Sequence, residues 1–167
     1  MEAPRLRKPL ALDTNLLLDL AAGANFAHEF REVFRNRGYG FLAPPTVLAE
    51  LHELSVHGVG VRKRELARIA LANILAWDVR PLRLSDIEAA LAERLGSRFL
   101  ELKLLPESEG NDALILAEAA LARVPLLVTS DKHLLDMDED RLALAFSDAD
   151  LPAAHPAHPK ALLRAMR

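Results

Sequence analysis

The sequence of 167 residues contains no cysteine. This absence excludes disulfide bonds, a thiolate nucleophile and a cysteine-ligated zinc site. Aromatic residues make up only 5% of the chain, so stacking on bases is not expected to dominate any nucleic-acid binding. No apolar run approaches the ~20 residues that cross a bilayer. The first apolar stretch is broken at Asp13 and Asn15, which argues against a signal peptide, and we expect a cytoplasmic protein without membrane association.

Charge of one sign is not in large excess either. The chain has 21 Lys and Arg against 24 Asp and Glu, a net charge of −3, with 51% hydrophobic and 27% charged residues. This composition is typical of a globular protein and argues against a generally basic surface for nucleic acid. The length fits one domain, which we assign to residues 1–150. The remaining residues, 151–167, contain several prolines and two histidines and are expected to form an extended tail over the surface.

Short apolar runs alternate with segments of helical periodicity along the chain. The runs predict strands at residues 10–12, 39–43, 77–82, 126–129 and 142–146. Apolar side chains at helical spacing predict helices between them, and Ser85 with Glu88 forms a capping box at the start of one helix. Strands separated by helices fold into a mostly parallel sheet covered on both faces. Ligands of such sheets bind beyond the carboxyl ends of the strands.

Two of the predicted strands end in an acidic residue. Asp13 follows Leu12, and Asp131 follows Thr129-Ser130. A carboxylate next to a buried strand is costly unless it is paired or binds a cation. Helix capping explains either residue alone, because Asp is a preferred N-cap residue. Two acids at equivalent strand ends instead favour a shared site.

Glu50 and Asp112 are two further candidate site residues. Glu50 lies close to the apolar face of a predicted helix, and Asp112 opens a helix after Gly110-Asn111. A surface glutamate and an acid favoured in the first helical turn are the alternative interpretations. Clustered carboxylates repel one another unless a cation balances them, and Mg²⁺ prefers oxygen ligands. Two such ions can activate a water and stabilise the leaving oxygen of a phosphodiester.

With these motifs in this order, the chain resembles the PIN domain family. The matching segments are Asp13-Thr14-Asn15, Glu50 in its helix, Asn111-Asp112 and Thr129-Ser130-Asp131. The resemblance covers roughly residues 9–146. It implies a three-layer α/β/α sandwich with a central, mostly parallel sheet.

The resemblance also implies a function, namely cleavage of single-stranded RNA by a water activated by Mg²⁺ or Mn²⁺. Asp13, Glu50, Asp112 and Asp131 would be the metal ligands, which makes them the catalytic carboxylates. Asn15 and Thr129 would orient these ligands, as outer-shell partners generally do.

The family includes the toxins of type II toxin–antitoxin pairs, so an antitoxin protein is one expected partner. An RNA-processing nuclease is an alternative role. A non-catalytic PIN-like module that binds RNA or protein is a second alternative. Retention of all four acids argues against the non-catalytic module, because a degenerate site does not need them.

Basic residues in two segments are candidates for contact with RNA phosphates. Lys132 and His133 directly follow Asp131, and Arg62, Lys63 and Arg64 form a basic cluster. Phosphate contacts of this kind would make RNA binding depend on salt. A solvated helix end is the alternative for the second cluster.

We also expect a homodimer that forms through the early helices. These helices are rich in apolar side chains, including Phe26, Phe30 and Phe34.

Overall fold

The structure is a computed structural model and describes residues 8–167. The strands are β1 (Lys8–Leu12), β2 (Tyr39–Ala43), β3 (Val79–Pro81), β4 (Leu126–Val128) and β5 (His155–Ala157). The helices are α1 (Thr14–Ala21), α2 (Asn25–Asn36), α3 (Pro45–His57), α4 (Val61–Asn73), α5 (Asp86–Glu101), α6 (Gly110–Leu121), α7 (Lys132–Leu135), α8 (Glu139–Asp148) and α9 (Pro159–Ala165), with a 3₁₀ turn at Glu107–Glu109.

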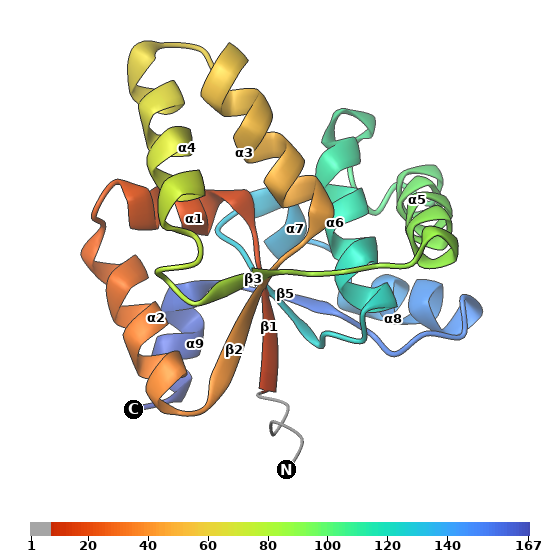
Figure 1. The fold of residues 1–167 in the computed structure, drawn as a ribbon. Helices are drawn as coiled ribbons and strands as arrows, with labels where there is room; N and C mark the ends of the chain where they lie inside the picture. The colour runs from red at the N-terminus through yellow and green to blue at the C-terminus, as the bar shows by residue number, and fades with distance from the viewer. Residues whose placement is uncertain (1–7) are drawn as a thin grey trace, which may run out of the picture.

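The strands form one parallel sheet in the order β3-β2-β1-β4-β5. Figure 1 shows this sheet edge-on, with α1, α2 and α9 on one side and α5, α6 and α8 on the other. The three-layer α/β/α fold predicted from the sequence is therefore confirmed.

The strand order reverses around β1, which creates the position where ligands bind in open parallel sheets. β1 pairs with β2 on one side and with β4 on the other. Leu12 lies in register with Val128, and the Asp13 backbone N–H donates to the Val128 carbonyl at 3.0 Å. The first residues after these two strands, Asp13 and Thr129, therefore emerge next to each other.

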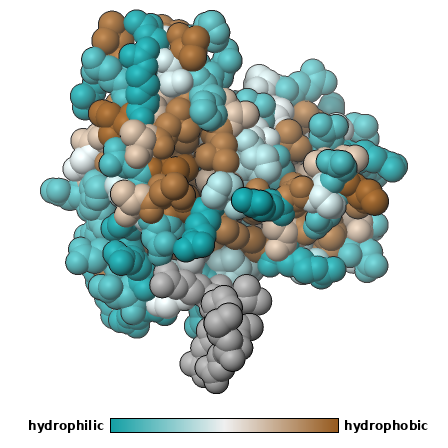
Figure 2. Space-filling model, viewed as in Figure 1, coloured by the Kyte–Doolittle hydropathy of each residue, from teal (hydrophilic) through white to brown (hydrophobic). Residues whose placement is uncertain are grey.

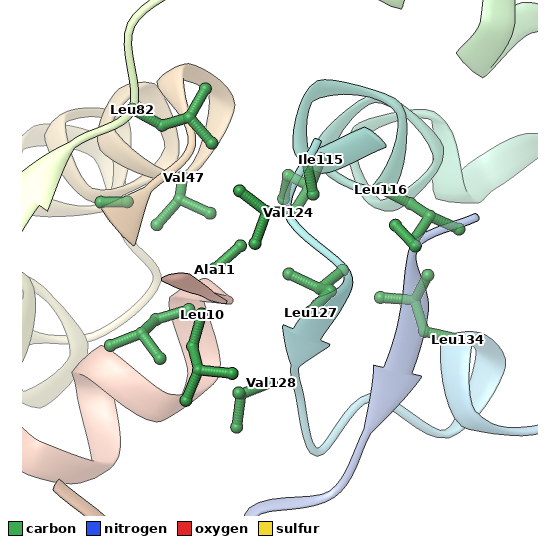
Figure 3. Close-up of a cluster of buried hydrophobic side chains, with 14 of the residues drawn as sticks. Leu10, Ala11, Val47, Leu82, Ile115, Leu116, Val124, Leu127, Val128 and Leu134 are labelled. Carbon is green, nitrogen blue, oxygen red and sulfur yellow. The ribbon is translucent and has the colours of Figure 1, made fainter. Parts of the chain in front are cut away.

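The core around this position is made of aliphatic side chains from the strands and the covering helices. Leu10 and Ala11 of β1 and Leu127 and Val128 of β4 are almost fully buried. Figure 3 shows Val47 of α3, with Ile115 and Leu116 of α6, among the side chains that surround the strands. The strand ends are thus held by close packing, which gives the residues that follow them defined positions.

Residues 142–146, predicted as the last strand, instead lie in α8. Leu142, Ala145 and Phe146 are the buried residues of this helix, and their spacing of three and four is helical. Asp138 caps the helix by accepting a hydrogen bond from the Arg141 backbone N–H at 3.0 Å. The strand prediction was wrong because an apolar run this short fits the two-residue repeat of a strand and the 3.6-residue repeat of a helix equally well.

The predicted surface tail instead supplies β5 and α9. β5 pairs with β4, and the Thr129 backbone N–H donates to the Ala157 carbonyl at 2.9 Å. Pro156 is tolerated in β5 because an edge strand leaves one row of backbone groups unpaired. α9 packs on α2, where the Lys160 ammonium lies 5.0 Å from the centre of the Phe26 ring. The prediction of a tail over the surface was therefore wrong, although the backbone is extended at residues 155–157.

Two of the phenylalanines expected at a dimer surface are core residues. Phe30 and Phe34 are 1% and 2% exposed, and their rings stack at 4.6 Å. The large exposed apolar side chains at the turn between α3 and α4 are Val56, Val59 and Val61. Figure 2 shows hydrophobic residues at this projecting end of the molecule. Among residues 8–167, no helix has the length and apolar character needed to cross a membrane.

Candidate active site

Asp13 lies at the carboxyl end of β1 and is 2% exposed. Its Oδ1 accepts a hydrogen bond from the Thr14 backbone N–H at 2.8 Å, which caps α1. Its Oδ2 accepts a hydrogen bond from the Thr129 hydroxyl at 2.6 Å. Burial raises the pKa of Asp13, the bonds from Thr129 and Thr14 oppose that rise, and the charge of Asp131 adds to it. Asp13 is thus a helix cap and also a buried acid at the sheet edge.

Thr129 joins the two strand-end acids. It is fully buried, and its hydroxyl donates to Asp13 and accepts a hydrogen bond from the Asp131 backbone N–H at 2.9 Å. Asp131 Oδ1 in turn accepts from the Leu134 backbone N–H at 3.1 Å and caps α7. These bonds place Asp13 and Asp131 in a defined arrangement above β1 and β4.

Glu50 approaches the same site from α3. Its Oε1 is buried without a hydrogen-bond partner in the part of the chain that the structure describes, and so is the neighbouring Thr14 hydroxyl. Burial and the charges of Asp13 and Asp131 raise the pKa of Glu50 to about 7, against an opposing effect of the nearby Thr14 hydroxyl. A buried carboxylate oxygen without a partner is costly, which makes it a position where a ligand gains binding energy.

Asp112 lies in the first turn of α6 and is half-buried. Burial, a hydrogen bond with the Glu109 carboxyl and the charges of Asp13 and Asp131 together raise its pKa to about 8. Asp112, Asp131 and Glu109 each place one carboxylate oxygen within 4.8 Å of the others. Charge interactions link Asp13 and Glu50 to this group, so the four predicted acids lie together at one edge of the sheet.

Glu109 is the site residue that the sequence analysis missed. It lies at the end of the 3₁₀ turn, directly before α6 and three residues before Asp112. Its Oε1 is 3.6 Å from His133 Nε2. The spacing of three residues to Asp112, which is close to one helical turn, was the available signal.

Asn15, expected to orient the acids, is exposed in the first turn of α1. Its side chain donates no hydrogen bond to a carboxylate within residues 8–167. Lys132 and His133, expected to contact RNA, are exposed at the start of α7 beside Asp131.

The basic cluster of α4 lies away from the acidic site. Arg62 and Lys63 are exposed at the start of α4, at the projecting end of the α3–α4 pair (Figure 1). Arg64 is partly buried, and its guanidinium donates to the Gly58 carbonyl at 2.9 Å, which closes the turn between the two helices. Seven residues separate Glu50 from the end of α3 at His57, or ~10 Å along a helix. The structure does not bring this cluster to the carboxylates.

The acidic site fits a hard divalent cation. Every side-chain donor in the cluster is a carboxylate oxygen, the ligand type that Mg²⁺ and Mn²⁺ prefer. Burial and the charges of neighbouring acids raise the pKa values of Glu50 and Asp112, so a cation would favour their ionised forms. Glu50 Oε1 is buried without a hydrogen-bond partner among residues 8–167, and a bound cation would be a partner for this oxygen. The fold and this carboxylate cluster define a class of parallel α/β/α proteins that carry an acidic site at the point where the strand order reverses.

Comparison with known families agrees with this class. The PIN domain profile matches residues 10–140, and the chain belongs to the PIN domain family. Members of this family are generally nucleases that use divalent metals. A comparison with curated protein sequences finds no match.

Several solved structures share the fold. VapBC2 from Rickettsia felis, bound to a DNA fragment from its promoter, is 17% identical with a TM-score of 0.61 over 90% of this chain and 98% of that one. VapBC-1 from nontypeable Haemophilus influenzae is 15% identical with a TM-score of 0.56, over 91% and 98% of the two chains. FitAcB from Neisseria gonorrhoeae is 14% identical with a TM-score of 0.52, over 90% and 97% of the two chains. At these identities the likeness establishes the common fold.

Proposed function

We propose that this protein is an endoribonuclease that hydrolyses phosphodiester bonds of single-stranded RNA with the help of Mg²⁺ or Mn²⁺. The observation that carries the proposal is the carboxylate cluster at the reversal point of the sheet, where burial raises the pKa values of Glu50 and Asp112. Such a cluster is costly for a protein that has no cation to bind, so its purpose is best explained by metal-dependent chemistry.

The ligands that we propose are Asp13, Glu50, Asp112 and Asp131, with Glu109 as an additional carboxylate. A bound divalent ion lowers the pKa of water and neutralises charge on the phosphate and leaving oxygen. The 2.6 Å hydrogen bond from Thr129 fixes the orientation of the Asp13 carboxyl and favours its ionised form. Water attacks phosphorus and the bond to one ribose oxygen breaks, so the products carry a phosphomonoester and a hydroxyl group. A 2′,3′-cyclic phosphate is not formed, because the 2′-hydroxyl is not the nucleophile.

RNA reaches the site past exposed basic residues. Lys132 and His133 are the closest of these in sequence to Asp131, and we propose that they contact the phosphate being cleaved or its neighbour. Arg62, Lys63 and Arg64 lie at the projecting end of α3 and α4, where they would meet a more distant part of the strand. Lysine and arginine contacts to phosphates weaken as salt is raised.

We further propose an antitoxin protein as partner. The solved VapBC and FitAB structures cover 90% or more of this chain with the same fold, which supports a role as the toxin of such a pair. Co-expression with the product of an adjacent small gene, followed by purification on a tag carried by that product, tests this role. A nuclease that cleaves RNA but has no such partner would point to RNA processing.

The homodimer stays a prediction. Phe30 and Phe34 cannot form its contact surface, because both are buried in the core. Light scattering of the purified protein measures its mass directly. A stable monomer at micromolar concentration would contradict it.

Cleavage of a fluorescent, mixed-sequence single-stranded RNA tests the nuclease proposal. We expect products with Mg²⁺ or Mn²⁺ and none with a chelator. The Asp13→Asn variant should lose cleavage at least 100-fold, because it removes a charge from the cluster while keeping the side-chain shape (the order of magnitude of a lost catalytic electrostatic contact). Asp140→Asn, which removes an exposed carboxylate from α8, is the matched control and should cleave normally.

Two results would overturn the proposal. Equal cleavage by Asp13→Asn and wild type would show that the activity comes from elsewhere. Binding of metal and RNA without cleavage would favour the non-catalytic PIN-like module.

A further inference from the structure

A buried carboxylate on α6 lies outside the acidic site. Glu118 is 6% exposed, and its Oε1 accepts a hydrogen bond from the Thr46 backbone N–H at 3.1 Å. Its Oε2 accepts from the Thr46 hydroxyl at 3.0 Å. Thr46 lies in the first turn of α3, 72 residues earlier in the chain. Both oxygens of Glu118 are therefore committed to one residue of another helix.

This contact replaces a cap that α3 does not have. The N-cap residue of α3 is Pro44, which has no side-chain acceptor, and Pro45 follows it in the first turn. The first N–H groups of a helix lack partners within the helix, and Pro45 has no N–H. Thr46 therefore carries the first N–H that needs an acceptor, and Glu118 supplies it. The negative charge also faces the positive end of the helix.

The two helices joined in this way carry two of the proposed metal ligands. Thr46 precedes Glu50 by four residues, about one turn of α3. Glu118 follows Asp112 by six residues on α6, or ~9 Å along the helix axis. The position of Glu50 relative to Asp112 therefore depends on how α3 is held against α6.

The surface beside Glu50 is hollowed between α3 and α6. A cleft of about 440 Å³ lies there, lined by Thr46, Ala49, Glu50, Glu53, Leu54 and Asn111. Within residues 8–167, the bonds between Glu118 and Thr46 are the only side-chain hydrogen bonds between α3 and α6.

We infer that Glu118 is a positioning residue for the metal site. It contacts no metal ligand, but through Thr46 it sets where Glu50 lies relative to Asp112. The inference rests on the proposed function, because it presumes that these acids bind a divalent ion. Loss of the Glu118 side chain should lower metal affinity and kcat, and leave the KM for RNA unchanged.

Mn²⁺ binding, measured by titration calorimetry, tests the inference without relying on cleavage. The variants are Glu118→Ala, Glu118→Gln and Thr46→Ser, and the matched control is Ser85→Ala. Ser85 caps α5, which carries none of the acids, by accepting from the Glu88 backbone N–H at 3.2 Å. Both variants remove a side-chain helix cap, and urea unfolding of each measures the stability that it costs. A loss of metal affinity in Glu118→Ala that exceeds what its lower stability explains, with none in Ser85→Ala, indicates a positioning role.

We expect Glu118→Ala to weaken Mn²⁺ binding about tenfold, the low end of the range for residues that bond a metal ligand directly, because Glu118 acts one contact further away. Thr46→Ser keeps the hydroxyl and the N–H, and should bind like wild type. Glu118→Gln keeps one acceptor and should fall between them, and it replaces the alanine variant if that variant does not fold. Ser85→Ala should bind Mn²⁺ normally.

Wild-type affinity in Glu118→Ala, or an equal loss in Ser85→Ala, would overturn the inference. Wild-type protein that binds Mn²⁺ but does not cleave RNA would overturn the nuclease proposal and leave this inference to be decided by the variants. Wild-type protein that binds no Mn²⁺ would overturn both.

Discussion

The Thr129 hydroxyl donates a 2.6 Å hydrogen bond to Asp13 Oδ2 and accepts one of 2.9 Å from the Asp131 backbone N–H. One buried hydroxyl thus connects the acids that end β1 and β4. Burial raises the pKa of Asp13, and this bond is the largest of the effects that oppose the rise. The relationship makes Thr129 a sensitive position for both stability and chemistry.

Replacement of Thr129 by valine should cost about 1–3 kcal/mol of unfolding free energy, because a buried acceptor and a donor lose their partner while the side-chain shape is kept. The pKa of Asp13 should rise further, since the Thr129 bond opposes the effect of burial. Urea unfolding measures the loss of stability. Metal-dependent cleavage should decrease as the pKa of Asp13 rises. Thr129→Ser keeps the hydroxyl and is the control. A valine variant as stable as wild type would contradict the role given to this bond.

Without metal, the protein should become less stable as the pH rises from about 4 to about 8. The pKa of Asp112 is about 8 in the folded chain against an ordinary value of 3.8, and that of Glu50 is about 7 against 4.5. Between these values the unfolded chain has released protons that the folded chain retains. The unfolded state therefore binds fewer protons, and the free energy of unfolding falls with pH.

Thermal unfolding in the presence of a chelator measures this dependence. Asp112→Asn should melt above wild type at pH 8, and the difference should shrink at pH 5, because the folded wild type keeps its carboxyl protonated there. Identical melting temperatures at both pH values would show that the Asp112 environment does not penalise its charge.

Mg²⁺ or Mn²⁺ should reverse the loss of stability at higher pH. Binding to the folded state alone stabilises it by about 2.7 kcal/mol when the free ion is at 100 times its Kd. The ion must displace the protons of Asp112 and Glu50, so the gain in melting temperature should be larger at pH 8 than at pH 6. Differential scanning fluorimetry with a metal titration measures it. Asp13→Asn should show little gain, whereas an equal gain in that variant would point to a different binding site.

Much of this arrangement was accessible from the sequence because it follows from chain order. Strands predicted at residues 10–12 and 126–129 end in Asp13 and Asp131, and parallel strands bring their carboxyl ends to one edge. Residues 142–146 were misassigned because five apolar-rich residues fit a strand as well as a helix, and the Asp138 cap decided it. β5 escaped prediction because its three residues include a proline, and pairing with β4 stabilises it only in the folded chain.

Two polar features escaped prediction for a related reason. Glu109 joins the site only because the 3₁₀ turn leads directly into α6, which places it beside Asp112. The contact between Glu118 and Thr46 spans 72 residues and no periodicity encodes it. Periodicity of a single chain predicts elements and their ends, whereas the pairing of side chains from distant elements depends on how those elements pack.

The two basic segments should affect RNA cleavage differently, because they lie at different distances from the carboxylates. Lys132 directly follows Asp131, so Lys132→Gln should raise KM for short and long RNA alike. Arg62 and Lys63 lie at the projecting end of the α3–α4 pair, so Arg62→Gln with Lys63→Gln should raise KM for a long RNA and leave a trinucleotide unaffected. Each lost phosphate contact should also reduce the slope of log affinity against log salt by ~0.7 for a single strand. Steady-state cleavage of both substrates at several salt concentrations separates these effects. A trinucleotide KM that rises in the double variant would mean that the α4 cluster lies closer to the site than the structure places it.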